Sequence, residues 1–265
     1  MHLSAIHVYP LKSGAALSPA QVEVERRGLA QDRRWMIVDD SGRFLTGRQV
    51  PALVTLRALP QADGLRLQRA DGAALFVPVP LSAASRRRVV VWNDAVEALD
   101  GGDAAARWLS DWLGRELRLV HMDAAATRAV DPARSRAGDE VSFADGFPLL
   151  LISQAALDGL NARLAAPVPM LRFRPNLVVA GSEAHAEDGW RRLRIGAIEL
   201  EAVKPCVRCV FTTVDPERGA FDPTGEPLKT LKHYRRGEKG ITFGMNLIAR
   251  GSGSLRLGDA VEVLA

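Results

Sequence analysis

Both cysteines of the chain lie in one short segment, Pro205-Cys206-Val207-Arg208-Cys209. The thiolate form of cysteine is a nucleophile and a soft metal ligand, so cysteines at this spacing suit several kinds of chemistry. They could form half of a zinc site, a redox pair of the thioredoxin type, or one functional thiolate beside an inert neighbour. The alternative without chemistry is that both are buried and pack as small hydrophobic side chains.

The remaining sequence gives little support to a zinc site or a redox pair. Zinc sites use about four ligands, but the 5 histidines are scattered and the chain has no second Cys-x-x-Cys. A thioredoxin-type motif begins a helix after a strand, whereas the segment 212–216 (TTVDP) has no helical pattern. Lys204 and Arg208 are close in sequence, and nearby cations favour a thiolate. On the residues alone, the single thiolate and the buried cysteines both stay open.

Lys12 and Ser13 suit an anionic ligand. They follow the first predicted strand, and Gly14 after them allows a close approach of the backbone. A surface turn would explain the same residues equally well.

Two pairs of arginines have a similar character. Arg33 and Arg34 precede the apolar run 35–38, and alternation along a strand should turn one inward and the other outward. In Arg172-Phe173-Arg174-Pro175-Asn176, we again expect the two arginines to face different ways. Guanidinium groups bind phosphate in a bidentate manner. The alternative for each arginine is a surface salt bridge.

Composition limits the class of protein. With 265 residues, 47% of them hydrophobic, the chain can bury a core in one large or two modest domains. The net charge of +4 is too small to predict nucleic-acid binding. The two cysteines indicate a reducing compartment. No secretory signal or membrane-spanning segment is evident, so we expect a cytoplasmic protein without a membrane partner.

Strands dominate the predicted structure. Residues 1–99 contain short strand patterns without intervening helices, which predicts a barrel or sandwich; they fall at 3–9, 22–25, 35–38, 44–46, 53–59, 65–69, 75–79 and 89–92. Helices are predicted at 103–113, 153–164 and 228–234. The polar segment 123–139 reads as a loop that crosses between domains. We therefore expect an α+β, β-rich fold with one domain at 1–122 and another at 123–265.

Several motifs resemble those of the MOSC domain. They are PC-x-RC-x-x-TTVDP, GEPLKTLKHYR, FG-x-N and the terminal LRLGDAVEVL, and they are preceded in the family's order by YPLKS, DRRWMIVD and RFRPN. The resemblance covers essentially the whole chain. It is closest to the branch with an N-terminal β-barrel domain, which includes the mitochondrial amidoxime-reducing component and bacterial relatives. The resemblance implies the same two domains here, the second being mainly β-barrel with a few helices.

The resemblance also implies a molybdenum–molybdopterin cofactor. Cys209 matches the thiolate ligand of molybdenum, and Arg208 matches a basic position beside it. The positions that hold the pterin and its phosphate match Lys12, Ser13, Arg33, Arg174 and Asn176, and Asn246 borders the same pocket. The chain departs from the pattern before residues 148–152, where relatives have hydroxyl residues and this chain has Gly146 and Phe147. Backbone contacts could survive there, but contacts from side-chain hydroxyls could not.

The activity implied by the resemblance is reduction of N-hydroxylated compounds, such as amidoximes and hydroxylamines. No nicotinamide or flavin fingerprint is present, so the electrons should come from a separate protein: a ferredoxin, a cytochrome b5-like protein or a flavin reductase. Two alternatives are a carrier that holds sulfur or molybdopterin on Cys209, and a binding module without catalytic activity.

Overall fold

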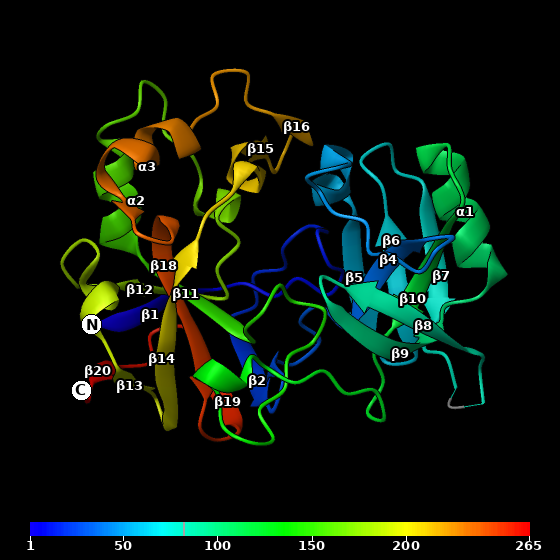
Figure 1. The fold of residues 1–265 in the computed structure, drawn as a ribbon, viewed down its shortest axis with the longest axis horizontal. Helices are drawn as coiled ribbons and strands as arrows, with labels where there is room; N and C mark the ends of the chain where they lie inside the picture. Colours follow the sequence, from blue (N-terminus) through cyan, green and yellow to red (C-terminus); the bar gives the residue numbers. More distant parts are fainter. Residues whose placement is uncertain (82) are drawn as a thin grey trace.

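The computed structural model describes residues 1–81 and 83–265. Two lobes lie side by side, and both chain ends belong to the same lobe (Figure 1). None of the helices in these described ranges is long and apolar enough to cross a membrane.

One lobe is a barrel-like arrangement of two small sheets. The first has the order β4 (Trp35–Asp39), β10 (Leu117–His121), β9 (Asp94–Asp100), β8 (Arg86–Val91), and the second has β5 (Arg57–Gln61), β6 (Gly64–Gln68), β7 (Ala74–Pro78). Inward-facing residues such as Trp35, Leu65 and Leu119 form a shared core, which the helix α1 (Asp103–Leu113) covers with Ala105 and Leu109. The predicted bounds of α1 are correct. Its N-terminal cap residue is Gly102, and Asp103 lies in the first turn.

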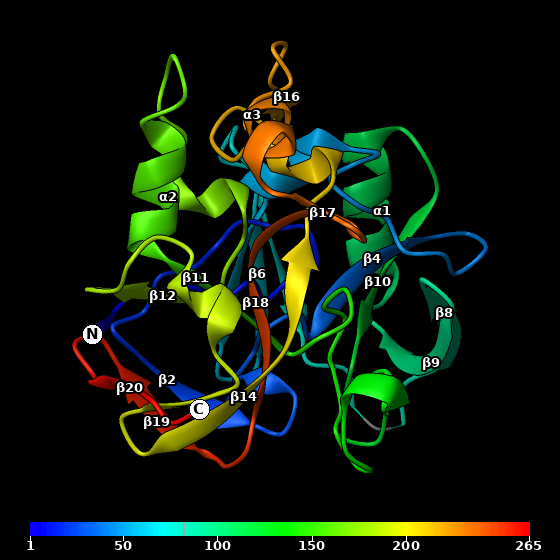
Figure 2. The same ribbon diagram turned by 60° about the vertical axis from the view of Figure 1, so that its left-hand side comes forward.

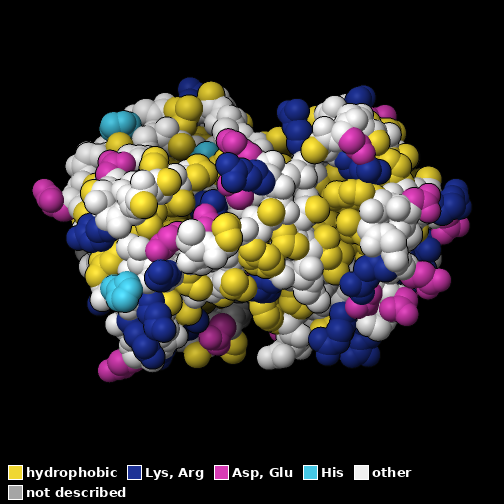
Figure 3. Space-filling view, turned by 90° about the horizontal axis from the view of Figure 1, so that it is seen from above, with side chains coloured by type: hydrophobic (Ala, Val, Ile, Leu, Met, Phe, Trp, Pro, Cys, Tyr) yellow, Lys and Arg dark blue, Asp and Glu magenta, His cyan; other side chains and the backbone are white. Residues whose placement is uncertain are grey.

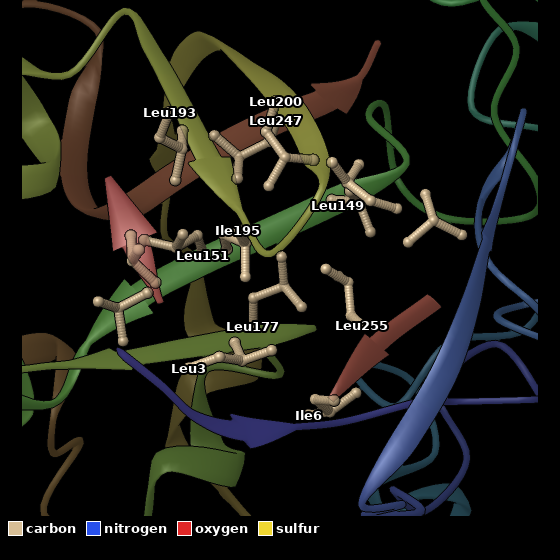
Figure 4. Close-up of a cluster of buried hydrophobic side chains, with 14 of the residues drawn as sticks. Leu3, Ile6, Leu149, Leu151, Leu177, Leu193, Ile195, Leu200, Leu247 and Leu255 are labelled. Atoms are coloured by element: carbon tan, nitrogen blue, oxygen red, sulfur yellow. The ribbon is translucent and has the colours of Figure 1, made fainter. Parts of the chain in front are cut away.

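The other lobe is built on an eight-stranded sheet. Its order is β1 (His2–Ile6), β12 (Leu177–Ala180), β11 (Leu149–Ser153), β18 (Gly240–Ala249), β14 (Ile198–Val207), β13 (Arg192–Ile195), β20 (Val261–Val263), with β17 (Arg236–Gly237) beside β18. Backbone hydrogen bonds from Leu3 to Asp259 and from Val261 to Met1 join the two edges and nearly close the sheet into a barrel. Leucine and isoleucine side chains from these strands meet in its interior (Figure 4). The α+β, β-rich fold class is therefore correct.

The start of the chain belongs to the C-terminal lobe. In addition to β1, strand β2 (Gln21–Glu25) pairs with β19 (Gly253–Arg256) and with β3 (Gly28–Leu29). The chain passes into the barrel-like lobe at Trp35 and returns after His121. The predicted division at residues 122 and 123 stays a prediction, but the crossing places the segment before Trp35 against both lobes.

The helices α2 (Gln154–Asn161) and α3 (Leu228–Tyr234) lie over one end of the C-terminal lobe, together with β16 (Ala220–Phe221), which pairs with β15 (Val214–Asp215) (Figure 2). The described residues also form short 3-10 helices: η1 (Pro51–Thr55), η2 (Pro132–Arg134), η3 (Met170–Arg172), η4 (Ala186–Gly189) and η5 (Val210–Thr213). Ser153 caps α2, since its hydroxyl accepts a hydrogen bond from the Ala156 amide. The helix ends before Leu164 because the Asn161 side chain binds the backbone of Val168.

Two strand predictions in the barrel-like lobe are wrong. Residues 51–55 form η1, with Pro51 at its start, so the strand predicted at 53–59 begins only at Arg57. Proline favours the first turn of a helix and lacks the amide that a sheet needs, which explains the difference. The predicted strand at 44–46 makes only an isolated bridge, from Phe44 to Val38.

Candidate functional site

A cleft at the junction of the lobes contains every residue that the sequence predicted for the site. Its volume is about 130 Å³, and it opens to solvent. The predicted residues in its walls are Lys12, Ser13, Arg33, Arg174, Asn176, Arg208, Cys209 and Asn246. Seen from above, the molecular surface is indented between the lobes, and hydrophobic side chains gather there (Figure 3). The roles assigned to the individual residues stay predictions.

The two cysteines have different surroundings. Strand β14 runs through a bulge around Pro205 and continues to Val207. Cys206 is half-buried, packs against the core cluster that contains Phe173 and Phe243, and its sulfur lies 2.9 Å from Nη1 of Arg208. Cys209 is exposed and is the cap residue of η5. The arrangement presents one accessible sulfur in the cleft, beside a second thiol held at the edge of a core.

An aromatic ring supports two of the predicted cations. The guanidinium carbons of Arg33 and Arg174 lie 4.2 and 4.1 Å from the centre of the Tyr9 ring. The Tyr9 hydroxyl donates a hydrogen bond to the backbone oxygen of Pro175, and burial raises its pKa to about 12, against the opposing effect of both arginines. A neutral ring under two cations provides a cation–π platform. Tyr9 belongs to the YPLKS motif, but its neighbours in space could not be read from its neighbours in sequence.

Arg33 is further fixed by polar side chains. It forms an ion pair with the buried Asp32 at 2.5 Å and donates to Oδ1 of Asn176 at 3.1 Å. Arg34 turns the other way and pairs with Glu25, so the two arginines diverge as predicted. Arg172 and Arg174 also diverge: Arg172 contacts Asp215 and Asp222, whereas Arg174 donates to the backbone oxygen of Gly14.

Strained backbone accompanies these side chains. Ser13, Arg33 and Arg174 have φ values of 65°, 49° and 55°. A residue other than glycine seldom adopts a positive φ, and such residues cluster where a ligand is bound. The fold holds all three in this conformation at one cleft, so their positions are set by more than local preference.

Lys12 and Asp145 form the remaining charged pair of the cleft. The buried Lys12 ammonium donates to Asp145 and to the backbone oxygen of Phe143, each at 2.7 Å. Burial lowers the pKa of Lys12 to about 8, although Asp145 opposes the shift. Desolvation opposes ionisation of Asp145, but the charge of Lys12 outweighs it and holds the pKa of that carboxyl well below its usual range. Asp145 was not predicted, because nothing in the sequence links it to Lys12.

The loop after Asp145 retains donors despite its missing hydroxyls. Within residues 1–81 and 83–265, the backbone amides of Asp145, Gly146 and Phe147 have no hydrogen-bond acceptor in the protein. A backbone amide without a partner in the protein can donate to an anionic ligand. The departure from the family's hydroxyl pattern therefore leaves a backbone site in the same wall.

Other donors in the cleft also lack partners. Nη2 of Arg174 and Nε of Arg208 are buried without a hydrogen-bond partner in the described part of the chain. Burial lowers the pKa of Arg174 to about 10, so the residue stays charged near neutral pH. Asn246 uses its amide nitrogen on the backbone oxygen of Lys204. Unpaired cationic donors around one exposed sulfur fit a phosphate-bearing anion that carries a thiophilic metal.

One neighbour of Cys209 was missed by sequence reasoning. Arg48, from the loop after β4, places Nη1 3.5 Å from the Cys209 sulfur. Its guanidinium carbon lies 4.6 Å from the centre of the Trp92 ring. No periodicity or motif spacing in the sequence marks Arg48, because the contact joins residues from different lobes.

Known protein families match both halves of the chain. Residues 1–116 match the family described as "MOSC N-terminal beta barrel domain", and residues 138–262 match the family described as "MOSC domain". The chain is 35% identical over 280 residues to the mouse protein "Mitochondrial amidoxime-reducing component 1", covering 99% of this chain and 82% of that protein. It is 36% identical to rat "Mitochondrial amidoxime reducing component 2", covering 98% and 82%. Human "Mitochondrial amidoxime-reducing component 1" is 32% identical, covering 99% and 82%.

Similarity to solved structures is more distant. YiiM from Geobacillus stearothermophilus aligns with a TM-score of 0.34 and 13% identity over 45% of this chain and 55% of that one. A Bordetella bronchiseptica protein solved in solution aligns with a TM-score of 0.31 and 21% identity, over 38% and 85%.

Proposed function

Because the chain belongs to the MOSC family of amidoxime-reducing components, we propose that it binds a molybdenum–molybdopterin cofactor in the cleft and reduces N-hydroxylated compounds. The observation that carries this proposal is the accessible Cys209 sulfur in a cleft lined by unpaired cationic donors. A buried-cysteine protein would need neither the exposure nor the cations.

The residues present fit such a cofactor. Cys209 would hold the metal, since a thiolate is a soft ligand. Arg174, Lys12 and the amides after Asp145 would hold the anionic phosphate and pterin, with Arg33 placed beside them on Tyr9. When bound, the cofactor would supply oxygen-atom-transfer and two-electron redox chemistry.

The protein contributes position and charge to this reaction. Reduction of an amidoxime to an amidine consumes two electrons and two protons and releases water. The open mouth of the cleft admits the substrate beside Cys209, while Tyr9, Asp32 and Asn176 fix the cations without mobile counterions. A separate protein would supply the electrons; the candidate classes are a ferredoxin, a cytochrome b5-like protein and a flavin reductase.

The proposal is tested on protein purified from a host that makes molybdopterin. We expect molybdenum and pterin in comparable amounts, and reduction of an amidoxime with an artificial electron donor. Zinc in place of molybdenum, with no pterin fluorescence after oxidation, would contradict the cofactor assignment. Pterin without reductase activity would instead support a carrier of molybdopterin.

A further inference from the structure

Arg48 is a cation beside the exposed thiol of Cys209, with an unusual set of neighbours. It is half-buried, donates to the Cys209 sulfur at 3.5 Å, and stacks on Trp92. In the part of the chain that the structure describes, no carboxylate lies within ion-pair distance of it. Asp145 acts on Arg48 only from beyond that distance, since Arg48 is one of the cations that lower the pKa of its carboxyl. The fold therefore holds a guanidinium beside the exposed thiol without a direct ion pair.

Trp92 supports Arg48 at a cost to the local backbone. The loop Trp92-Asn93 joins β8 to β9, and Trp92 has a φ of 57°. A hairpin loop with a positive φ only at its first residue resembles a type II′ turn, which favours glycine at that position. A bulky side chain there is a marked exception. Trp92 is 41% exposed, and its ring contacts Phe44, with 5.1 Å between the ring centres, as well as Arg48.

The loop that carries Arg48 is also held from the other lobe. The ring of Phe211 lies against Gly47, where an added Cβ would come within 2.3 Å of Cε2. Phe211 follows Cys209 closely in sequence, and its ring lies 5.6 Å from the guanidinium of Arg174. The Arg48 side chain thus starts from a backbone packed on the same segment that carries the thiol.

From this geometry we propose that Arg48, supported by Trp92, selects ligands of Cys209 by charge. The site then favours N-hydroxylated compounds that carry an anionic group, such as a carboxylate, over their neutral or cationic analogues. A guanidinium recognises a carboxylate by charge-assisted hydrogen bonds, and an unpaired one is free to do so. The substrate class rests on the proposed function, whereas charge selection at the thiol does not.

The first test needs no cofactor. In Cys206→Ser protein without cofactor, Cys209 is labelled with methanethiosulfonate reagents that carry either a sulfonate or a trimethylammonium group. The ratio of the two rates reports the charge around the thiol, because the fraction of thiolate cancels. We expect Arg48→Gln to lower the ratio of anionic to cationic reagent roughly tenfold. The matched control is Arg66→Gln, which removes an exposed arginine of β6 outside the cleft and should leave the ratio unchanged.

The variant Trp92→Gly tests whether Trp92 supports the Arg48 side chain or is needed for folding. Glycine relieves the positive φ, so the melting temperature should change by only a few degrees while the reagent ratio falls as in Arg48→Gln. A large fall in melting temperature without a change in ratio would assign Trp92 to folding and overturn its role in support.

The second test uses the cofactor-loaded protein and two substrates, benzamidoxime and its 4-carboxy derivative. We expect Arg48→Gln to lower the ratio of kcat/KM for the carboxylated over the plain substrate roughly tenfold. An unchanged substrate ratio overturns the assigned substrate class, and an unchanged reagent ratio overturns charge selection itself. If no amidoxime is reduced by any variant, the proposed function fails, while a reagent ratio that depends on Arg48 still supports charge selection at the thiol.

Discussion

The side-chain oxygen of Asn176 accepts a hydrogen bond from Arg33 at 3.1 Å, across 143 positions of sequence. The same oxygen accepts from the backbone amide of Leu150, and the side-chain nitrogen donates to the backbone oxygen of His7. Asn176 is 1% exposed. Its polar side-chain atoms thus link the segments that carry His7, Arg33 and Leu150. In the cleft wall, Asn176 positions Arg33.

Replacing Asn176 with alanine should therefore weaken the fold as well as the site. The change leaves the buried Leu150 amide and His7 carbonyl without partners, at a cost of about 1–3 kcal/mol each. We expect urea unfolding to show a loss of that order, together with loss of the cofactor. Asn246→Ala is the control, because Asn246 is half-buried and makes one bond, to Lys204. Unchanged stability with cofactor lost would instead assign Asn176 to direct cofactor binding.

How far the sequence could predict the site depends on the kind of contact. Motif resemblance identified Lys12, Arg33, Arg174 and Cys209, and side-chain alternation separated Arg33 from its neighbour. Contacts between distant segments were out of reach, as with Arg48 beside Cys209, because no local pattern records which loops a fold brings together.

Local propensity also failed near the thiol. Thr212 and Thr213 have high strand propensity, yet they lie in η5. Their hydroxyls donate to the backbone oxygens of Cys209 and Val210, so these side chains support a helical turn instead of a strand. The C-terminal end of α1 was easier to predict from the sequence, since Gly114 takes the left-handed conformation typical of a helix end.

Arg174 and Arg172 should respond differently to truncation, although both are buried arginines two positions apart. Arg174 makes one hydrogen bond, to Gly14, and no ion pair in the described residues, so Arg174→Ala should cost about 1 kcal/mol of stability. Loss of a charge-assisted contact should weaken cofactor retention roughly ten- to hundredfold. Thermal melts of cofactor-free protein and gel filtration of loaded protein measure the two effects.

Arg172→Ala provides the contrast. Arg172 pairs with Asp215 and Asp222 and donates to the backbone oxygen of Thr213. Its removal should cost about 3 kcal/mol, at the low end for a buried ion pair because both carboxylates are partly exposed. A large loss of stability in Arg174→Ala would show that this residue too has a structural role.

Lys12 should make stability depend on pH in the alkaline range. The pKa of Lys12 is about 8 in the folded protein, whereas its ordinary value, which applies to the unfolded chain, is 10.5. Between these two pH values the unfolded chain therefore holds a proton that the folded chain has released. The contribution of Lys12 to the free energy of unfolding therefore rises with pH between 8 and 10.5, and it is lost as the pH falls through 8. Relative to Lys12→Met, the wild-type free energy of unfolding should rise by about 3 kcal/mol from pH 7 to 10.5. A constant difference between the two proteins in urea unfolding would contradict the shift.

The two cysteines should differ in their importance for the metal. In Cys209→Ser the soft thiolate is replaced by a hard oxygen, so molybdenum binding and reductase activity should be lost. Cys206→Ser should retain both, because Cys206 lies at the edge of a core, and a serine oxygen can still accept a hydrogen bond from Arg208. We expect this variant to lose only about 1 kcal/mol of stability. Molybdenum content per protein and activity with an artificial donor are measured for both variants. Equal loss of metal from both would show that the thiols act as a pair, a result that the different surroundings of the two sulfurs argue against.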